Sequence, residues 1–523
     1  MTRGELSAAD LEQLRRRGIT VAEVERQLDL FRHPPRALHL LRPCRPGDGI
    51  VRLERARREE LLERCARAAA AGRLLAFIPA SGAASRMFES LLAVLQEEPP
   101  ATLFDLERRA GAGERPAADV LRLWSHLPDF AFHQELEAAM RAGGIDLDAA
   151  RAAGDHEAVL RALLAVPGLG YAERPKALIA FHRAATGVRT ALAEQLVEAA
   201  EYLADAGGVV RMHFTVAPEH EELVGAHLDR AAASLAADRG VRLEVALSRQ
   251  DPATDTLAVD VYNRPVRSAD GALLFRPGGH GALLANLEAT GGDVVFVKNI
   301  DNAVPDRRKP LTVRWKRLLA GHLLRLQEAA FAHLERLEAE SLDAAALAAA
   351  EEFSSAELGR PWPQGFSAAT GAERAARLRD LLDRPLRICG MVPNQGQPGG
   401  GPFWVVDRAG EVSRQIVESS QVDDESEAQR AIWEASTHFN PVDLVCGLRD
   451  RRGRPYELAR FVDPDSVCIS TKSADGRRLR ALERPGLWNG AMAGWNTVFV
   501  EVPADTFAPV KTVLDLLRPE HVC

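Results

Sequence analysis

Paired cysteines are missing from this sequence. Its six cysteines are scattered over 523 residues and include no C-x-x-C pair, so neither a disulfide framework nor a tetrahedral zinc site is expected. The first residues lack the apolar segment of a secretory signal, and no apolar run approaches the ~20 residues of a membrane helix. We therefore expect a cytoplasmic protein without a membrane partner.

A surplus of basic side chains is lacking too. The chain has 66 Lys and Arg residues against 74 Asp and Glu residues, a formal net charge of −8. A nucleic-acid scaffold usually shows a basic face, so we expect no nucleic-acid partner, although one local basic pocket for a small anion is compatible with this balance. The motifs G-x-S-x-G and H-E-x-x-H are absent, which removes sequence support for a serine hydrolase or a zinc protease.

The most informative stretch joins a strand pattern to a helical pattern through small residues. Residues 74–78 are apolar, and a helical pattern follows the loop that ends at Arg86. The small residues of the loop are Ser81, Gly82, Ala83, Ala84 and Ser85. Backbone N–H groups and a helix N-terminus would meet there and favour an anion, and Arg86 adds a guanidinium suited to phosphate. The loop matches neither the Walker nor the Rossmann pattern, so a turn without a ligand is the open alternative.

Downstream, short apolar runs alternate with helical patterns. This alternation predicts an α/β fold with a mostly parallel sheet, in which ligands collect at the carboxyl ends of the strands. The loops 79–86, 277–281 and 299–302 each follow a predicted strand, and we expect them to share one pocket. We expect an N-terminal helical region over 1–72 and an α/β domain over 73–523 with helical insertions at about 100–170 and 311–380.

Three polar residues in or near these loops are candidates for binding. Asp301 follows a buried strand pattern, where a carboxylate can hold Mg²⁺ jointly with phosphate oxygens; capping of the next turn is the alternative. Lys176, which follows a proline, could pair with phosphate or be solvated. His280 lies between glycines and could contact a base or a sugar, or have no function.

Seven short blocks occur in a fixed order between residues 74 and 515. They are Gly82–Arg86, Pro175–Lys176, Pro277–Gly281, Ile300–Asn302, Gln415–Gln421, His438–Asp443 and Phe507–Lys511. Taken together, the blocks resemble those of the UDP-sugar pyrophosphorylases, particularly the UDP-N-acetylhexosamine type, within the nucleotide-diphospho-sugar transferase superfamily. The whole chain, including residues 437–446 and 486–492, looks closer still to a bacterial family catalogued as a domain of unknown function.

The resemblance implies a three-layer α/β fold with N-terminal and inserted helices. It also implies a Mg²⁺-dependent nucleotidyltransferase that joins a nucleoside triphosphate, UTP favoured, to a sugar 1-phosphate and releases pyrophosphate. The implied catalytic residues are Arg86, Lys176 and Lys511, with Asp301 as the metal ligand. The implied nucleotide- and sugar-binding residues are Ser81, Gly82, Ala83, Ala84, Ser85, Gly278, Gly279, His280, Gly281, Glu418 and Asn440.

The sequence departs from the family pattern at a few positions. Ala83 and Ala84 stand where more permissive residues are expected, His280 replaces an amide, and Asp443 stands near an expected asparagine. These departures concern the binding of the triphosphate and the choice of base and sugar. Two alternatives stay open: a non-catalytic nucleotide-sugar sensor on the same fold, which the alanines favour, and a glycosyltransferase, which would need an acceptor cleft.

Overall fold

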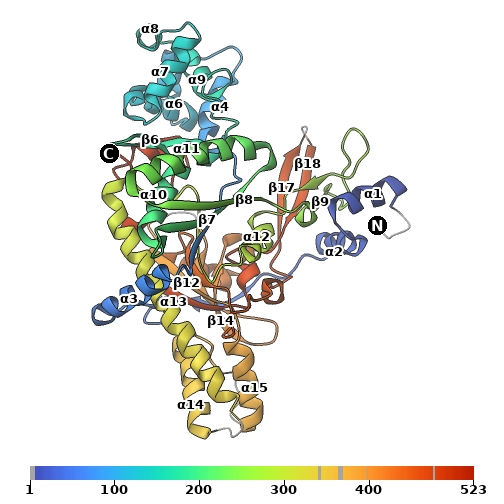
Figure 1. Cartoon of the computed structure of the whole chain (residues 1–523). Coiled ribbons are helices and arrows are strands. Elements are labelled where there is room, and N and C mark those ends of the chain that lie inside the picture. The colour runs from blue at the N-terminus through green and yellow to red at the C-terminus, as the bar shows by residue number, and fades with distance from the viewer. Residues whose placement is uncertain (1–5, 340–342, 363–368, 397–398, 475–476, 523) are drawn as a thin grey trace. The chain divides into compact units, whose positions relative to one another are not determined.

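The computed structural model describes residues 6–339, 343–362, 369–396, 399–474 and 477–522. The chain is a mixed α/β protein with a mostly parallel central sheet, and it divides into two compact units (Figure 1). Unit 1 comprises residues 1–77, 248–297 and 317–503, and unit 2 comprises residues 78–247, 298–316 and 504–523.

The main sheet contributes seven strands to unit 1 in the order β2-β3-β19-β12-β16-β11-β4. They are β2 (Arg45–Pro46), β3 (Gly49–Val51), β4 (Leu74–Pro79), β11 (Val294–Lys298), β12 (Leu386–Pro393), β16 (Asp443–Gly447) and β19 (Asn496–Glu501), with β15 (His438–Phe439) beside β12. The pairs β2–β3, β3–β19, β19–β12 and β11–β4 are parallel, whereas β12–β16 is antiparallel. Every residue of β11 and β16 is buried, as expected for strands covered on both faces.

Two smaller sheets complete unit 1, and each is covered by helices. The first is antiparallel, in the order β10-β9-β18-β17, and consists of β9 (Thr256–Val259), β10 (Phe275–Arg276), β17 (Cys468–Ala474) and β18 (Arg477–Glu483). Leu14, Leu28 and Phe31 of the N-terminal helices pack into one core with Leu257 and Leu482 of this sheet. The second sheet consists of β1 (His39–Pro43), β13 (Gly401–Val406) and β14 (Val412–Val417), and α16 (Glu427–Glu434) packs on it.

The two N-terminal helices, α1 (Ala8–Arg17) and α2 (Val21–Arg32), begin and end where local sequence predicts. Ser7 and Asp10 form a reciprocal capping box at the start of α1, and Gly18, with φ 71°, ends it. Thr20 caps α2 by accepting a hydrogen bond from the backbone N–H of Glu23.

The remaining helices of unit 1 lie between its strands in the sequence. They are α3 (Arg58–Ala70), α12 (Leu284–Ala289), α14 (Ala344–Glu352) and α15 (Gly371–Leu382), and α13 (Lys309–Leu337) begins in unit 2 and ends in unit 1. α14 packs against α15, and Arg379 of α15 donates to the carbonyl of Leu337 at the end of α13. A π-helical turn, Phe353–Glu357, continues α14.

Unit 2 combines strands with two groups of helices (Figure 1). Its strands are the neighbours β7 (Val209–Val216) and β8 (Arg242–Arg249) and the hairpin β5 (Ala180–Ala184) and β6 (Gly187–Thr190). α10 (Ala191–Leu203) packs on β7 and on α11 (Glu221–Arg239). A separate group consists of α4 (Glu89–Leu95), α5 (Leu103–Gly111), α6 (Arg115–Ser125), α7 (His133–Ala142), α8 (Leu147–Ala153) and α9 (His156–Leu164).

Most of the predicted alternation is confirmed. Strands and helices alternate from β7 through α11 and β8 to β11, and residues 100–170 hold five α-helices. The helical expectation for residues 1–72 is wrong over 39–51, where three strands form that are too short to show a periodic pattern. A domain boundary after residue 72 stays a prediction, because a compact unit is not by itself an independently folding domain.

One predicted strand is interrupted. The sequence pattern of residues 438–445 predicts a single strand, but β15 and β16 are separated by a break that contains Pro441 and Val442. Proline has no N–H to donate to a ladder, and Val442 adopts a left-handed φ of 57°. Both features end the pairing, so the expectation of one continuous strand is wrong.

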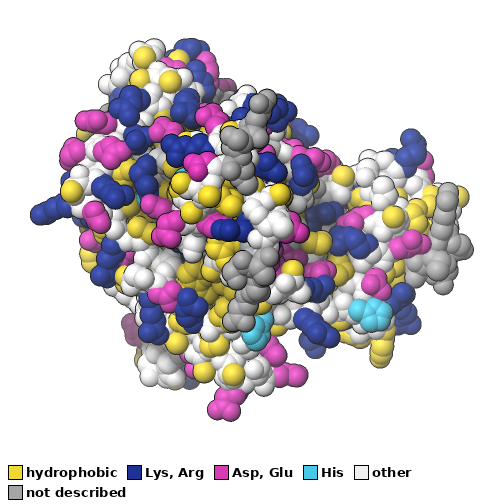
Figure 2. Space-filling view, turned by 90° about the horizontal axis from the view of Figure 1, so that it is seen from below, with side chains coloured by type: hydrophobic (Ala, Val, Ile, Leu, Met, Phe, Trp, Pro, Cys, Tyr) yellow, Lys and Arg dark blue, Asp and Glu magenta, His cyan; other side chains and the backbone are white. Residues whose placement is uncertain are grey.

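Charged side chains of both signs are mixed over the visible surface. On the face drawn in Figure 2, Lys and Arg side chains of the described residues alternate with Asp and Glu side chains. Among the described helices, none combines the length and the apolar composition that crossing a membrane requires.

Candidate functional site

Two of the predicted loops leave the sheet at one edge. β4 and β11 are parallel neighbours, with Leu74 opposite Val294 and Phe77 opposite Val297, so the loops after them start at the same side of the sheet. These loops, residues 80–86 and 299–302, both belong to unit 2. The loop 277–281 instead follows β10 of an antiparallel sheet in unit 1. The expectation that it follows a strand of the parallel sheet is therefore wrong, and a pocket shared by all three loops stays a prediction.

The 80–86 loop is tied by its backbone to the segment that carries Lys176. Ala83 forms an isolated antiparallel bridge with Pro175. The N–H of Ala84 donates to the carbonyl of Arg174 at 3.0 Å, and the N–H of Lys176 donates to the carbonyl of Gly82 at 3.1 Å. The Pro175–Lys176 pair thus lies beside the 80–86 loop, although the helical insertion separates them in sequence.

The loop uses ordinary backbone conformations. Neither Gly82 nor Ala83 has a positive φ, and Ala84 has φ −80°, so the alanines introduce no strain. Gly82 and Ala83 are exposed, and a Cβ added at Gly82 would meet no atom within 4 Å. Glycine is therefore not required there by the fold, and its exposed backbone is open to a ligand.

The element after the loop differs from the prediction. A 3₁₀ turn, Ser85–Phe88, comes first, and α4 begins only at Glu89. The expectation that Arg86 stands at the mouth of an α-helix is therefore wrong, and a helix dipole contributes less than predicted. Arg86 is exposed, and among the described residues it has neither a hydrogen bond nor an ion pair.

The predicted charged residues Lys176, Asp301 and Lys511 meet at one point of unit 2. Asp301 Oδ2 accepts a hydrogen bond from the Nζ of Lys176 and another from the Nζ of Lys511, each at 3.0 Å. The side chains of Lys176 and Asp301 are 15% and 10% exposed, whereas that of Lys511 is 54% exposed. The cluster is thus buried on one side and open on the other.

The C-terminal segment brings Lys511 to this cluster through main-chain contacts. The N–H of Val510 donates to the carbonyl of Asp301 at 3.0 Å, and Asn302 forms an isolated bridge with Pro509. The N–H of Ala508 donates to Asn302 Oδ1 at 3.2 Å. Lys176 Nζ also donates to the carbonyl of Val510 at 3.0 Å, so these groups hold one another in place.

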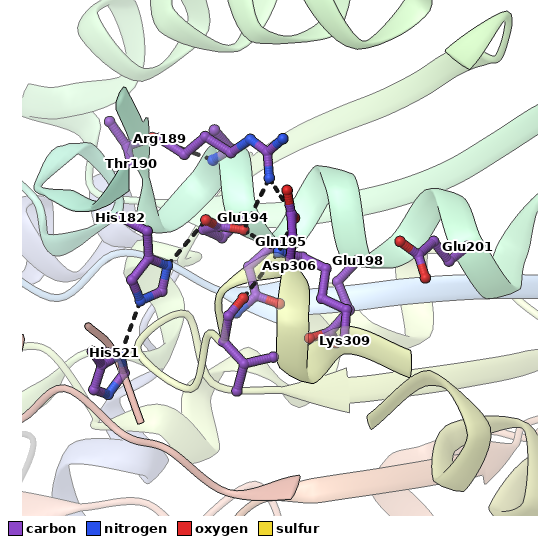
Figure 3. Close-up of polar contacts among 12 residues, drawn as sticks. His182, Arg189, Thr190, Glu194, Gln195, Glu198, Glu201, Asp306, Lys309 and His521 are labelled. Carbon is purple, nitrogen blue, oxygen red and sulfur yellow. Dashed lines mark hydrogen bonds and ion pairs between the residues drawn. The ribbon is translucent and has the colours of Figure 1, made fainter. Parts of the chain in front are cut away.

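Helix α10 supports the 299–302 loop from behind. Gln195 Nε2 donates to the carbonyls of Asn299, Ile300 and Asn302 at 3.4, 3.2 and 3.0 Å. Glu194, which directly precedes Gln195, is also buried. Its carboxylate binds His182 Nδ1 at 3.0 Å and the Nζ of Lys309 (Figure 3).

The same helix neutralises a second buried lysine. Glu198 binds Lys298 Nζ at 2.7 and 2.8 Å. Burial alone would raise the pKa of Glu194, but His182 and Lys309 hold it below its ordinary value. The loop that carries Asp301 therefore rests on a buried, charge-paired helix.

The electrostatics of the Asp301 cluster favour anions. Burial alone would raise the pKa of Asp301, but the ammonium groups of Lys176 and Lys511 outweigh it and hold that pKa below its ordinary value. One carboxylate between two ammonium groups leaves surplus positive charge. Asp301 Oδ1 is buried and has no hydrogen-bond partner among the described residues, so it can serve as one ligand of a cation. No group of three or more His, Cys, Asp or Glu side chains in the described residues could hold a metal.

The predicted base- and sugar-binding residues lie in unit 1. The ring of His280 stacks on Trp488, with centroids 4.1 Å apart and planes at 11°. The N–H of Leu487 donates to His280 Nδ1 at 2.9 Å, and burial lowers the pKa of His280 although Glu418 and Glu483 oppose the shift. A neutral ring that accepts at Nδ1 carries its proton on Nε2, so His280 is a hydrogen-bond donor there.

The predicted glycines beside His280 have a packing role. A Cβ at Gly281 would lie 2.0 Å from the carbonyl oxygen of Pro485, and one at Gly278 would lie 2.5 Å from that of Thr254. Gly279 has φ 76°, which favours glycine. These residues are glycines because the backbone packs closely, and contact with a sugar stays a prediction.

Asn440 is likewise engaged by the fold. Its Nδ2 donates to the carbonyl of Gly390 and its Oδ1 accepts from the N–H of Val442, both at 3.0 Å. The residue is 4% exposed. Glu418 is half-buried and follows β14. Sugar binding by either residue stays a prediction.

Sequence reasoning missed several residues that lie around the Asp301 loop or contact His280. Glu194, Gln195 and Glu198 interrupt an otherwise apolar helix, and Lys298 ends an apolar strand. Charged residues inside apolar elements indicate buried ion pairs, so this signal was available. The stack of Trp488 on His280 had no signal, because nothing in the sequence joins these two segments.

A family model matches residues 7–522, and its description is "Domain of unknown function (DUF4301)". No curated protein matches the chain. Among solved structures, the chain is similar to the uridine diphosphate N-acetylglucosamine pyrophosphorylase of Trypanosoma brucei in complex with an inhibitor, with 11% identity and a TM-score of 0.48. It is also similar to a mutant UDP-glucose pyrophosphorylase of Leishmania major in complex with UDP-glucose, with 13% identity and a TM-score of 0.46.

Each of these two similarities covers 98% of this chain and 79% of the other. The structural neighbours are thus UDP-sugar pyrophosphorylases, as the sequence blocks suggest, but nothing about activity follows at this identity. Because the family model spans nearly the whole sequence, the chain belongs to the DUF4301 family.

Proposed function

We propose that this protein is a nucleotidyltransferase that joins a nucleoside triphosphate, UTP favoured, to a sugar 1-phosphate and releases pyrophosphate. The observation that carries the proposal is the contact of Lys176 and Lys511 with Asp301. Surplus positive charge at the carboxyl end of parallel strands suits a polyphosphate. The colinear sequence blocks support the same reaction, and the three-layer arrangement of the transferase superfamily is part of the proposal.

The proposed chemistry is an in-line displacement at phosphorus. A phosphate oxygen of the sugar 1-phosphate attacks the α-phosphorus of the triphosphate and forms a new P–O bond. The bond from the α-phosphorus to the oxygen that bridges it to the β-phosphate breaks, and pyrophosphate leaves with the electron pair. Because the substrate supplies the nucleophile, the protein contributes positioning and charge neutralisation.

The three basic residues have different tasks in this proposal. Lys176 is largely buried and fixed by the carbonyl of Val510, so it orients a phosphate. Lys511 is half exposed and can turn from Asp301 towards the α-phosphate or the sugar phosphate. Arg86, exposed on its 3₁₀ turn, neutralises the leaving pyrophosphate, and the backbone of 81–85 lies along the phosphates.

The residues of the cluster fit a Mg²⁺ ion that is held partly by the substrate. Magnesium commonly takes one or two carboxylates together with substrate phosphates, and Asp301 Oδ1 is a buried carboxylate oxygen that no donor in the described part of the chain reaches. When bound, the ion would neutralise charge on the phosphate oxygens. Asp301 would hold it, while Lys176 stays in place and Lys511 turns from the carboxylate to the phosphates.

In unit 1, the proposal assigns recognition of the sugar or base to the segment around His280. Its Nε2–H can donate to a carbonyl or hydroxyl oxygen, and the Glu418 carboxylate can accept from a sugar hydroxyl. Gly278, Gly279 and Gly281 would keep the backbone close, and Asn440 would hold the segment before β16. Each of these roles belongs to the proposal.

The test is pyrophosphate release with Mg²⁺ across a matrix of nucleoside triphosphates and sugar 1-phosphates. A signal that depends on both substrates, and that the Asp301→Asn variant loses, supports the proposal and names the substrates. If folded protein binds nucleotide or nucleotide sugar in calorimetry but releases no pyrophosphate with any pair, the sensor alternative replaces it. Sugar transferred to an acceptor without pyrophosphate would select the glycosyltransferase.

A further inference from the structure

A cavity of about 400 Å³ lies in unit 1, and none of its residues has a role in the proposed reaction. It is lined by most of residues 46–52, around the turn between β2 and β3, together with Ala356 and Arg414. This volume lies within the range of small-molecule sites. The lining combines apolar side chains such as Ile50 and Val51 with guanidinium groups and glycine backbone.

The feature that sets this cavity apart is a buried guanidinium without a counter-ion. Arg414 is 4% exposed. Its Nη2 donates to the carbonyl of Glu357 at 3.1 Å and its Nη1 to the carbonyl of Gly49 at 3.5 Å, while its Nε finds no partner in the ranges that the structure describes. Only two hydrogen bonds therefore engage its five N–H donors, and among the described residues it forms no ion pair.

The Glu357 carboxylate is engaged by another cation and offsets this charge only in part. The carboxylate of Glu357 binds Arg325 Nη2 at 2.8 Å. Trp404 lies beside the Arg414 guanidinium, 5.8 Å from ring centroid to Cζ. Buried charges in proteins are normally paired, because desolvation of a lone ion is costly. Burial lowers the pKa of Arg414 to about 10, so the group keeps its charge at neutral pH and still lacks an anion.

The surroundings hold this guanidinium rigidly at the cavity. Arg414 lies within β14 and pairs in register with Trp404 of β13. A Cβ at Gly359, which has φ 63°, would lie 2.3 Å from Arg414 Nε. Just before Gly359 in the sequence, Ala356 and the carbonyl of Glu357 come from the π-helical turn Phe353–Glu357, an irregularity that is frequent at functional sites.

We propose that this cavity binds a small ligand that carries a phosphate group. The phosphate pairs with Arg414, whose planar array of donors matches two phosphate oxygens. Arg52 also lines the cavity but is 68% exposed and paired with Glu501, so it contributes less to the attraction of the phosphate than Arg414 does. The rest of the ligand lies over Ile50, Val51 and Ala356.

The test uses inorganic phosphate as the probe. Calorimetry measures its affinity, and hydrogen exchange of the amides of residues 46–52 reports whether it occupies this cavity. The full-length Lys511→Ala variant serves as background, because it weakens phosphate binding at the proposed catalytic cluster. In that background, phosphate should slow hydrogen exchange of the amides of residues 46–52. Adding Arg414→Gln should weaken the affinity for phosphate about tenfold or more.

A second variant keeps the test decisive if Arg414→Gln does not fold. Ala356 is exposed and lines the cavity, so Ala356→Phe narrows the cavity while leaving Arg414 in the chain, and it should abolish the protection of 46–52. The proposal is overturned if both variants bind phosphate as tightly as the background protein. It is equally overturned if acetate at the same ionic strength gives the same protection. Neither outcome depends on pyrophosphate release, so this proposal and the proposed reaction fail independently.

Discussion

The backbone N–H of Val510 donates to the carbonyl oxygen of Asp301 at 3.0 Å. The position of the C-terminal segment beside the 299–302 loop is thus set by main-chain pairing, which the bridge between Asn302 and Pro509 extends. This main-chain pairing, and not the attraction of its charge to Asp301, positions Lys511. Its side chain can therefore be removed without moving the scaffold.

Replacing Lys511 with alanine should separate catalysis from stability. The ammonium group is half exposed, and exposed ion pairs contribute about 0–1 kcal/mol, so the free energy of unfolding should change by less than about 1 kcal/mol. Loss of a group that stabilises charge in the transition state should lower kcat/KM by about 100-fold or more. Steady-state pyrophosphate release and urea unfolding measure the two effects.

Arg518 offers a matched control in the same segment. Its side chain is 56% exposed and pairs with Asp515 at 2.7 Å, much as that of Lys511 pairs with Asp301. Arg518→Ala should leave both activity and stability close to those of the wild type. Equal losses of activity in the two variants would show that the segment, and not the Lys511 ammonium, is what matters.

Gly82→Ala should fold normally and bind nucleotide poorly. A Cβ at Gly82 meets no atom within 4 Å, and its φ is not left-handed, so the protein itself has room for the methyl group. The added methyl group would, however, occupy space that a phosphate needs when it approaches the loop backbone. The KM for the triphosphate should therefore rise about tenfold. Thermal unfolding and initial rates measure the two effects.

At Gly281, in contrast to Gly82, a substitution should affect the stability of the protein. A Cβ there would lie 2.0 Å from the carbonyl oxygen of Pro485, so Gly281→Ala should cost at least about 1–3 kcal/mol of stability. Unchanged nucleotide affinity in a stable Gly82→Ala protein would contradict the assignment of the 81–85 backbone to phosphate binding.

The carboxyl-end loops could be predicted because strand pattern and loop composition are local. Residues 74–78 and 294–297 are continuous apolar runs, and parallel strands deliver their following loops to one edge. That rule alone places the 80–86 loop and Asp301 on one side of the sheet. Lys511 was found only through the resemblance of its block, since no local rule connects it to Asp301.

Other residues escaped prediction because their partners come from distant segments. Gln195 contacts three carbonyls of the 299–302 loop, which only the packing of α10 reveals. Arg414 stands among polar residues in β14, a pattern that predicts exposure, yet unit 1 covers it. The 3₁₀ turn before α4 was missed because boundary residues such as Ser85 and Arg86 are compatible with either helix type.

Asp301→Asn should abolish turnover and make the protein less sensitive to acid. The substitution leaves two ammonium groups close together without a counter-charge, which should cost about 2–4 kcal/mol while leaving the protein folded. Because the pKa of Asp301 is held below its ordinary value of 3.8, the stabilisation is fully present above that value. It is lost as the pH falls through the lowered pKa.

The measurement is the difference in unfolding free energy between wild type and Asp301→Asn as a function of pH. It should be constant from pH 7 to about pH 5 and should shrink below about pH 4. A difference that stays constant down to pH 3 would show that the carboxylate charge is not what the lysines stabilise. Full turnover in the variant would remove Asp301 from the mechanism.

His280 should stay neutral with its proton on Nε2 in mildly acidic solution. The N–H of Leu487 occupies Nδ1, and burial lowers the pKa of the ring. A lowered pKa means that the unfolded state binds the proton first, so this residue's contribution to stability falls as the pH drops below 6.5. Nitrogen chemical shifts of the imidazole followed through its titration identify the tautomer, and a titration midpoint at or above 6.5 would contradict the lowered pKa.

Gln195→Met should loosen the loop that carries Asp301 while keeping the volume of the side chain. The three carbonyls of Asn299, Ile300 and Asn302 lose their shared donor, and buried carbonyls left unpaired cost about 1–3 kcal/mol. Amide exchange over 300–302 and 508–510 should accelerate, and kcat should fall more than the affinity for nucleotide, because Gln195 positions Asp301 without touching a substrate.

Gln27→Met is the matched control for this prediction. Gln27 is a fully buried glutamine of unit 1 whose Oε1 accepts from the N–H of Leu257 at 2.8 Å. Its loss should lower stability by a similar amount and leave exchange over 300–302 and kcat unchanged. If both variants lower kcat in proportion to their loss of stability, Gln195 acts only through the global fold. If Gln195→Met alone slows turnover, the support from α10 is part of what places the Asp301 carboxylate between its two lysines.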